Sequence, residues 1–156
     1  MRRFVALSLL TCVASLGCFG AERSPEERIR AVIAALEAAG QARDVGALKP
    51  HISESYADGS GNDRRALLGL ATAHFMRHQS VYLLVRVNGI ELPEPGKATA
   101  DAFVALAGQP IRDPSVLPEL HADLYRFTLA LREEDGEWRV TAADWHPATF
   151  ADFESD

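Results

Sequence analysis

Residues 125–146 read YRFTLALREEDGEWRVTAADWH, and this stretch decides the fold. Asp135 and Gly136 stand between two runs in which apolar and polar residues alternate, which is typical of a two-residue β-hairpin turn. Continued from that turn, the predicted cross-strand pairs are Glu134–Glu137, Leu131–Val140, Leu129–Ala142, Phe127–Asp144 and Tyr125–His146. The sequence therefore predicts a hairpin of two long antiparallel strands near the end of the chain.

This register predicts two unlike faces of the hairpin. The members of the first face are Tyr125, Phe127, Leu129, Leu131, Trp138, Val140, Ala142, Asp144 and His146. Because most of them are apolar, we expect this face to be covered by other elements. The opposite face carries Arg126 and Trp145, a predicted cation–π pair, and is expected to face solvent.

Tyr125, Asp144 and His146 would then lie at the polar end of a hydrophobic surface. A phenol, a carboxylate and an imidazole in such a place are candidates for acid–base catalysis or for orienting a ligand, with Phe127 as an apolar neighbour. The alternative is that the strand frays into solvent there, because Pro147 follows at once.

Two more strands and three helices are predicted upstream. The strands cover 81–92 and 97–107, and a break over 109–118 precedes the closing hairpin. Ser24 and Glu27 form a capping-box pattern around Pro25, and the first helix ends at Gly40. A short helix follows over 45–48, and a third begins at Asn62 or Asp63 and runs to about residue 77.

The third predicted helix carries Arg64, His74 and His78 on the same side as its apolar residues Leu67 and Phe75. Polar groups on an apolar side indicate the wall of a ligand-binding cavity. The alternative is that His78 lies beyond the last turn and His74 bonds a nearby carbonyl. We predict that Tyr125, Asp144 and His146 lie at the same end of the domain as His78 or Arg64.

No metal ion and no other cofactor are predicted. His74 and His78 have the i, i+4 spacing of zinc ligands, but the glutamate of an HExxH motif is missing. The oxygen-rich loop after Asp58 would need Gly and Glu at the sixth and twelfth positions of a calcium loop, and Asp63 and Gly69 stand there instead.

Composition limits the partners. The 156 residues are 47% hydrophobic and 24% charged, as in an ordinary globular domain, and the formal net charge is −6. Because an acidic surface repels phosphate backbones, nucleic acid is not an expected partner.

Residues 1–20 are predicted to be a secretory signal peptide. Arg2 and Arg3 precede an apolar run that is too short to span a bilayer, and small residues follow. Two cleavage positions remain open: before Cys18, which would then be lipidated, or after Gly20. The protein is therefore expected to be exported, either into the periplasm or attached to the cell envelope by a lipid anchor.

The order of these elements resembles the nuclear transport factor 2-like superfamily, which includes ketosteroid isomerases and polyketide cyclases. The matching pieces are 42–48, 52–58, the helix from Asn62 and the Asp135-Gly136 hairpin. The resemblance implies a single α+β domain over 21–156, in which a cone-shaped, curved antiparallel sheet wraps around three N-terminal helices. It also implies an apolar pocket at one end. The tyrosine that those isomerases carry on the first helix is missing here.

The leading functional hypothesis is an exported, cavity-bearing domain that binds a small apolar ligand or a protein partner without catalysis. A small acid–base enzyme that uses Asp144 or His146 as the base, with Tyr125 orienting the substrate, is the alternative. A third hypothesis is a module that forms a homodimer through its sheet.

Overall fold

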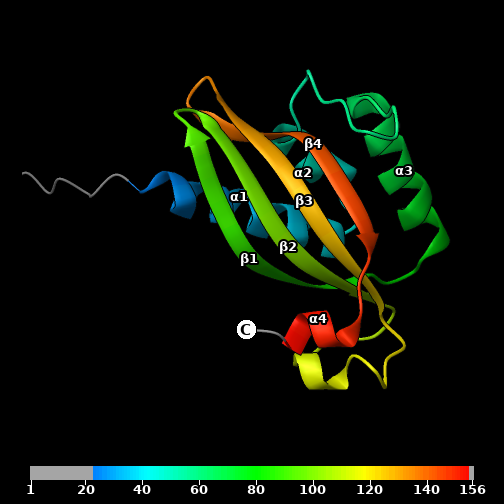
Figure 1. Ribbon diagram of the computed structural model, residues 1–156. Helices are drawn as coiled ribbons and strands as arrows, with labels where there is room; N and C mark the ends of the chain where they lie inside the picture. Colours follow the sequence, from blue (N-terminus) through cyan, green and yellow to red (C-terminus); the bar gives the residue numbers. More distant parts are fainter. Residues whose placement is uncertain (1–22, 155–156) are drawn as a thin grey trace, which may run out of the picture.

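The structure is a computed structural model that describes residues 23–154, so the predicted signal segment and Cys18 lie outside the described residues. The elements are α1 (Pro25–Gln41), α2 (Val45–Leu48), η1 (Lys49–His51), α3 (Arg64–Arg77), β1 (Tyr82–Glu94), β2 (Lys97–Ala107), η2 (Pro114–Val116), β3 (Asp123–Glu134), β4 (Glu137–Pro147) and α4 (Phe150–Glu154) (Figure 1). No helix within 23–154 is long and apolar enough to cross a membrane.

The three predicted helices are present, and their starts follow the predicted caps. The Ser24 hydroxyl accepts a hydrogen bond from the Glu27 amide at 3.2 Å, and the Glu27 carboxylate accepts one from the Ser24 amide at 2.8 Å. Asp44 caps α2, and Asp63 caps α3 by accepting from the Ala66 amide at 2.7 Å. These local patterns therefore define where the helices begin.

The strands form one open antiparallel sheet in the order β1-β2-β3-β4, which confirms the predicted α+β fold. We call the face that packs against α1 the inner face. The main core lies between the two, and its buried members include Ile29, Val32, Ile33, Ala98, Ala100, Leu129, Leu131, Trp138, Val140 and Ala143. Alternation along β2 brings alternate alanines to the inner face and turns Asp101 outward, as predicted.

The closing hairpin keeps the predicted register only from its turn to the pair Leu131–Val140. Asp135 and Gly136 both adopt positive φ, 53° and 79°, as a type I′ turn requires. A β-bulge then shifts the pairing by one residue. Beyond it the pairs are Ala130–Ala142, Leu129–Ala143, Thr128–Asp144, Phe127–Trp145, Arg126–His146 and Tyr125–Pro147.

The prediction that Asp144 and His146 share a face with Tyr125 and Phe127 is therefore wrong. A one-residue shift exchanges the two faces of a strand. With the bulge, Trp145 stacks on Phe127 (ring centroids 5.8 Å apart, planes at 22°), where the predicted register would place a carboxylate. The bulge thus lets an apolar side chain take the inner position, which avoids the cost of burying an unpaired charge.

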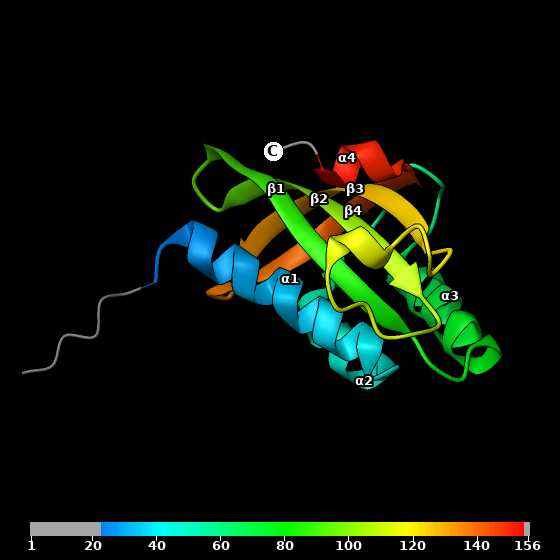
Figure 2. The ribbon, with the colours of Figure 1, turned by 90° about the horizontal axis from the view of Figure 1, so that it is seen from below.

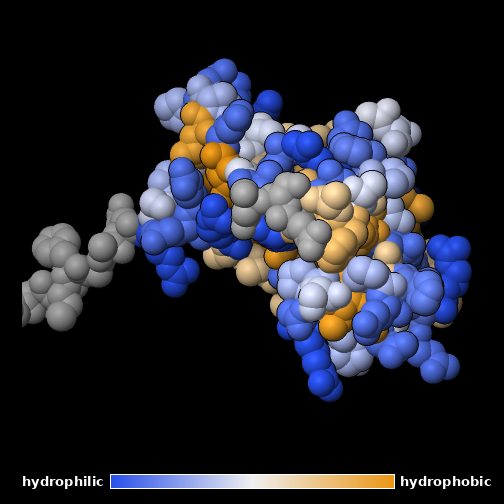
Figure 3. Space-filling model, turned by 60° about the horizontal axis from the view of Figure 1, so that its bottom comes forward, coloured by the Kyte–Doolittle hydropathy of each residue, from blue (hydrophilic) through white to orange (hydrophobic). Residues whose placement is uncertain are grey.

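The outer face of the sheet is not simply solvated. A second buried cluster, formed by Phe103, Ala105, Leu117 and Phe153, lies there beneath η2 and α4. In Figure 2, α1 and α4 lie on opposite sides of the sheet. The predicted cation–π pair of Arg126 with Trp145 is wrong, because Arg126 lies over the Phe103 ring on this outer face, at 5.8 Å. Figure 3 views the molecule with this end forward, and apolar patches lie among hydrophilic side chains there.

Candidate functional site

The inner face is apolar along its whole length, but only part of it is covered. Towards the hairpin turn its residues are buried beneath α1, for example Leu131 at 1% exposure. Towards the other end its residues are only partly buried, and we call this part the open half. Its members are Val104, Leu106, Tyr125, Phe127 and Trp145, on β2, β3 and β4.

Three aromatic side chains form a row across the open half. Tyr125 meets Phe127 edge to face, with centroids 6.4 Å apart, and Phe127 stacks on Trp145. Trp145 remains 37% exposed although it belongs to the face that packs against helices elsewhere. Such a row offers a flat apolar surface to a ligand.

Helix α3 flanks the sheet beyond β4 (Figure 1) and has no buried residue. Only Leu67 of this helix packs against the main core. His74 and His78 stack with ring centroids 4.3 Å apart, and burial, together with the charges of His78 and Arg77, lowers the pKa of His74. Among residues 23–154 no group of three metal-ligating side chains includes this pair.

The structure separates the residues that were predicted to share one cavity wall. Asp144 is exposed and points to the loop before α3, where its carboxylate lies 3.8 Å from the position of a Cβ on Gly59. His146 is also exposed and lies near Asp152 of α4, whose pKa is lowered chiefly by hydrogen bonds from Thr149 and to a lesser extent by the charges of Arg126 and His146. Tyr125 alone of the three stays with Phe127, so the predicted common wall is wrong.

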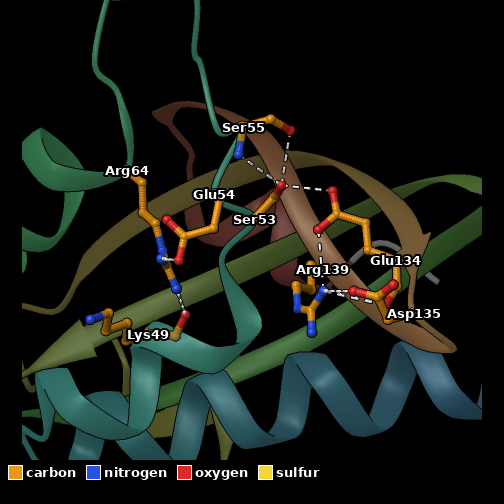
Figure 4. Close-up of polar contacts among 8 residues, drawn as sticks. All are labelled: Lys49, Ser53, Glu54, Ser55, Arg64, Glu134, Asp135 and Arg139. Carbon is orange, nitrogen blue, oxygen red and sulfur yellow. Dashed lines mark hydrogen bonds and ion pairs between the residues drawn. The ribbon is translucent and has the colours of Figure 1, made fainter.

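Arg64, a predicted ligand contact, is held in place by protein groups (Figure 4). Its guanidinium pairs with Glu54 and donates to the carbonyl of Lys49 at 2.6 Å, and its side chain is 14% exposed. It lines a cleft of about 370 Å³ together with Lys49, Glu54, Asp63, Arg65 and Leu68. Arg64 therefore first serves to tie the start of α3 to η1.

A second polar network joins the loop after η1 to the closing hairpin (Figure 4). The hydroxyl of Ser53, which is 1% exposed, donates to Glu134 at 2.7 Å and lies 2.9 Å from the Ser55 hydroxyl. Arg139 in turn contacts Glu134 at 3.4 Å. The Ser53 amide also donates to the Val140 carbonyl, so this loop covers the edge of β4.

The loop before α3 is organised by Asp58. Its carboxylate accepts hydrogen bonds from the Ser60 and Asn62 amides, at 3.0 and 2.9 Å, and from the Tyr56 hydroxyl at 3.1 Å. The Asn62 side-chain amide also donates to this carboxylate at 2.9 Å; this bond is the main cause that lowers the pKa of Asp58, and the other bonds lower it further. Burial and the Asp58 carboxylate raise the pKa of Tyr56 above its usual range. The oxygen-rich spacing of this loop is thus used for a turn.

A second cleft, larger than the one beside Arg64, lies at the opposite end from the aromatic row. We call it the hairpin cleft; it measures about 640 Å³ between the first turns of α1, His51 and the β3–β4 turn. Its lining residues are Arg23, Arg28, Ala31, Val32, His51, Glu133, Gly136, Glu137 and Trp138. The sequence carried no signal for it, because Arg28 and Glu133, which pair across it at 2.6 Å, are 105 residues apart.

On the free edge of β1, the carboxylate of Glu37 from α1 accepts a hydrogen bond from the Val85 amide at 3.2 Å. Burial raises the pKa of Glu37, and the bond from Val85 partly opposes that shift. The side chain therefore takes a backbone donor that no neighbouring strand takes.

No protein-family model and no curated protein matches the chain. Solved structures do. Bd1075 of Bdellovibrio bacteriovorus superposes with a TM-score of 0.64 at 7% identity, over 79% of this chain and 40% of that one. A provisionally named scytalone dehydratase from Novosphingobium aromaticivorans gives a TM-score of 0.66 at 9% identity, over 80% and 84%.

An NTF-2-like protein of unknown function from Shewanella oneidensis gives a TM-score of 0.57 at 16% identity, covering 78% of this chain and 98% of that one. At such identities the likeness concerns the path of the backbone, and function must be argued from the site. Three N-terminal helices against an open antiparallel sheet, with these neighbours, give the chain the nuclear transport factor 2-like fold.

Proposed function

We propose that this domain binds a small, uncharged apolar ligand on the open half of the inner face, between the aromatic row and α3. The observation that carries the proposal is the half-covered inner face: the same apolar surface is buried under α1 and partly exposed at Tyr125, Phe127 and Trp145. Contiguous apolar surface that a domain leaves uncovered is typical of a binding site.

We propose that this binding is not catalytic. Asp144 and His146, the candidate base residues, face away from the aromatic row because of the bulge. Tyr125 remains beside that row, where it can orient a ligand through its hydroxyl. His74 lies in the last turn of α3, and His78 is the extended residue just after it; the apolar ligand is expected to pack against their stacked rings.

The proposal can be tested with N-phenyl-1-naphthylamine, an uncharged apolar fluorophore. Replacing Trp145 with alanine should weaken its binding about tenfold, because one stacking partner and its apolar area are lost. Leu92→Ala is the matched control, since Leu92 is 42% exposed, close to the 37% of Trp145, but lies near the end of β1 that adjoins the β1–β2 turn. Fluorescence titration of the three proteins measures the effect.

Phe127→Ala should weaken binding at least as much, because Phe127 contacts both other rings of the row. The far-ultraviolet circular dichroism spectrum and the fluorescence of the buried Trp138 report whether this variant is folded. Equal affinities for the parent, Trp145→Ala and Phe127→Ala, or an equal loss in Leu92→Ala, would contradict the proposal.

We also propose that the chain is exported through residues 1–20. Its support is the basic start at Arg2 and Arg3 and the apolar run that follows. Mass spectrometry of the protein from its native host should find either a diacylglyceryl-modified Cys18 or a free Ala21 at the N-terminus. A protein that keeps residues 1–20 in every cell fraction would end this proposal.

A further inference from the structure

We infer that the hairpin cleft is a separate binding site for a small carboxylate with a flat apolar body, distinct from the open half of the inner face. The cleft has about 640 Å³, which suits a small organic molecule. Its buried apolar lining comes from Val32 and Trp138, while its rim carries charged side chains.

Each of the two clefts is lined by a residue that has a buried N–H group without a hydrogen-bond partner. Within residues 23–154 two buried side-chain nitrogens lack a hydrogen-bond partner, Trp138 Nε1 and Arg64 Nε. Trp138 lines the hairpin cleft, and Arg64 lines the cleft at the start of α3. Buried donors without partners are rare in folded proteins, so an unpaired indole N–H beside a cleft favours a ligand that brings an acceptor.

The rim has more free donors than free acceptors. The guanidinium of Arg28 already bonds to protein groups, because it pairs with Glu133 at 2.6 Å and donates to the Gly136 carbonyl. The side chains of Arg23 and His51 make no hydrogen bond or ion pair with the rest of the described chain. Glu137 is the remaining acid, so the rim has one free carboxylate for one free guanidinium and one imidazole, and the buried indole N–H of Trp138 is a further unpaired donor.

The two tryptophans of the chain allow a direct test, because Trp138 lines this cleft and Trp145 belongs to the aromatic row. In ¹⁵N-labelled protein, the two indole N–H signals are assigned with Trp138→Phe and Trp145→Phe. Benzoate should move the Trp138 signal with saturation and leave that of Trp145 in place. Three control compounds are used. Benzyl alcohol carries the ring without a charge, benzylamine carries the ring with the opposite charge, and inorganic phosphate is an anion without a ring.

Benzoate should bind at least about fivefold more tightly than each of the other three compounds, and Arg23→Gln should lower its affinity by about the same factor. Arg30→Gln is the matched control, because Arg30 is an exposed arginine in the first turns of α1 that does not line the cleft. The inference is overturned if phosphate, benzylamine or benzyl alcohol binds as well as benzoate. It is also overturned if only Trp145 responds, or if Arg30→Gln weakens binding as much as Arg23→Gln. The apolar ligand of the open half would instead move Trp145, so each proposal can fail without the other.

Discussion

Replacing Phe153 with alanine should lower the free energy of unfolding by about 3 kcal/mol, since Phe→Ala in a core typically costs 3–5 kcal/mol. Phe153 is 0% exposed, and its ring packs against that of Phe103 with the ring centroids 5.5 Å apart. Both belong to the second buried cluster, on the outer face of the sheet. Helix α4 has only five residues, so it has little stability apart from this contact. We expect a loss at the low end of the range of about 3–5 kcal/mol, because a short helix such as α4 can undock before the sheet unfolds.

Two measurements check this prediction. Urea unfolding followed by tryptophan fluorescence gives the total loss, and exchange of the Ala148 amide, which donates to the Leu124 carbonyl at 2.8 Å, reports undocking of the segment. Leu92→Ala, at an exposed position, should change stability by less than about 0.5 kcal/mol. A Phe153→Ala protein with unchanged Ala148 exchange and a loss below about 1 kcal/mol would show that α4 does not anchor the outer cluster.

Leu131→Ala should cost about 3 kcal/mol through the main core. Leu131 is 1% exposed and lies between Ala98 and Val140 on the neighbouring strands, so neither small neighbour can fill the space it leaves. The resulting cavity lies beneath α1. Unlike the loss at α4, this one should appear as a single cooperative transition for the whole sheet.

The matched control for this change is Leu70→Ala, because Leu70 is 50% exposed on α3. Urea unfolding of the two variants side by side should separate them by more than about 2 kcal/mol. A similar small loss in both would mean that the inner face near the turn repacks freely, contrary to the burial seen there.

Local signals in the sequence were sufficient for most of the fold. The capping box at Ser24 and Glu27, the cap at Asp63 and the turn at Asp135-Gly136 each depend on neighbours within four residues, and each is present in the structure. Alternation along β2 placed Asp101 correctly on the outer face. Such features are set by short-range hydrogen bonds and backbone conformation, which a single sequence displays directly.

The candidate site was less accessible, because it depends on contacts between distant segments. Alternation from the turn cannot reveal a bulge, and one extra residue near Thr141 exchanged the faces of Asp144 and Trp145. The outer cluster was missed although Thr149 and Asp152 show a capping pattern, since the docking of α4 depends on Phe103 and Leu117. The hairpin cleft likewise requires α1 and the last hairpin to meet.

The Glu37 contact has a consequence for how the protein behaves at high concentration. An exposed edge strand is a template on which another chain can add a strand, and this is a common start of aggregation. On β1 an incoming strand would find the Val85 N–H already occupied by a carboxylate, and the register shift between Val87 and Gly89 interrupts the edge a few residues further on. The Glu37 carboxylate therefore helps to prevent two molecules from pairing their β1 edges. In a concentrated solution, the Glu37→Ala protein should form fibres sooner than the unmodified protein does.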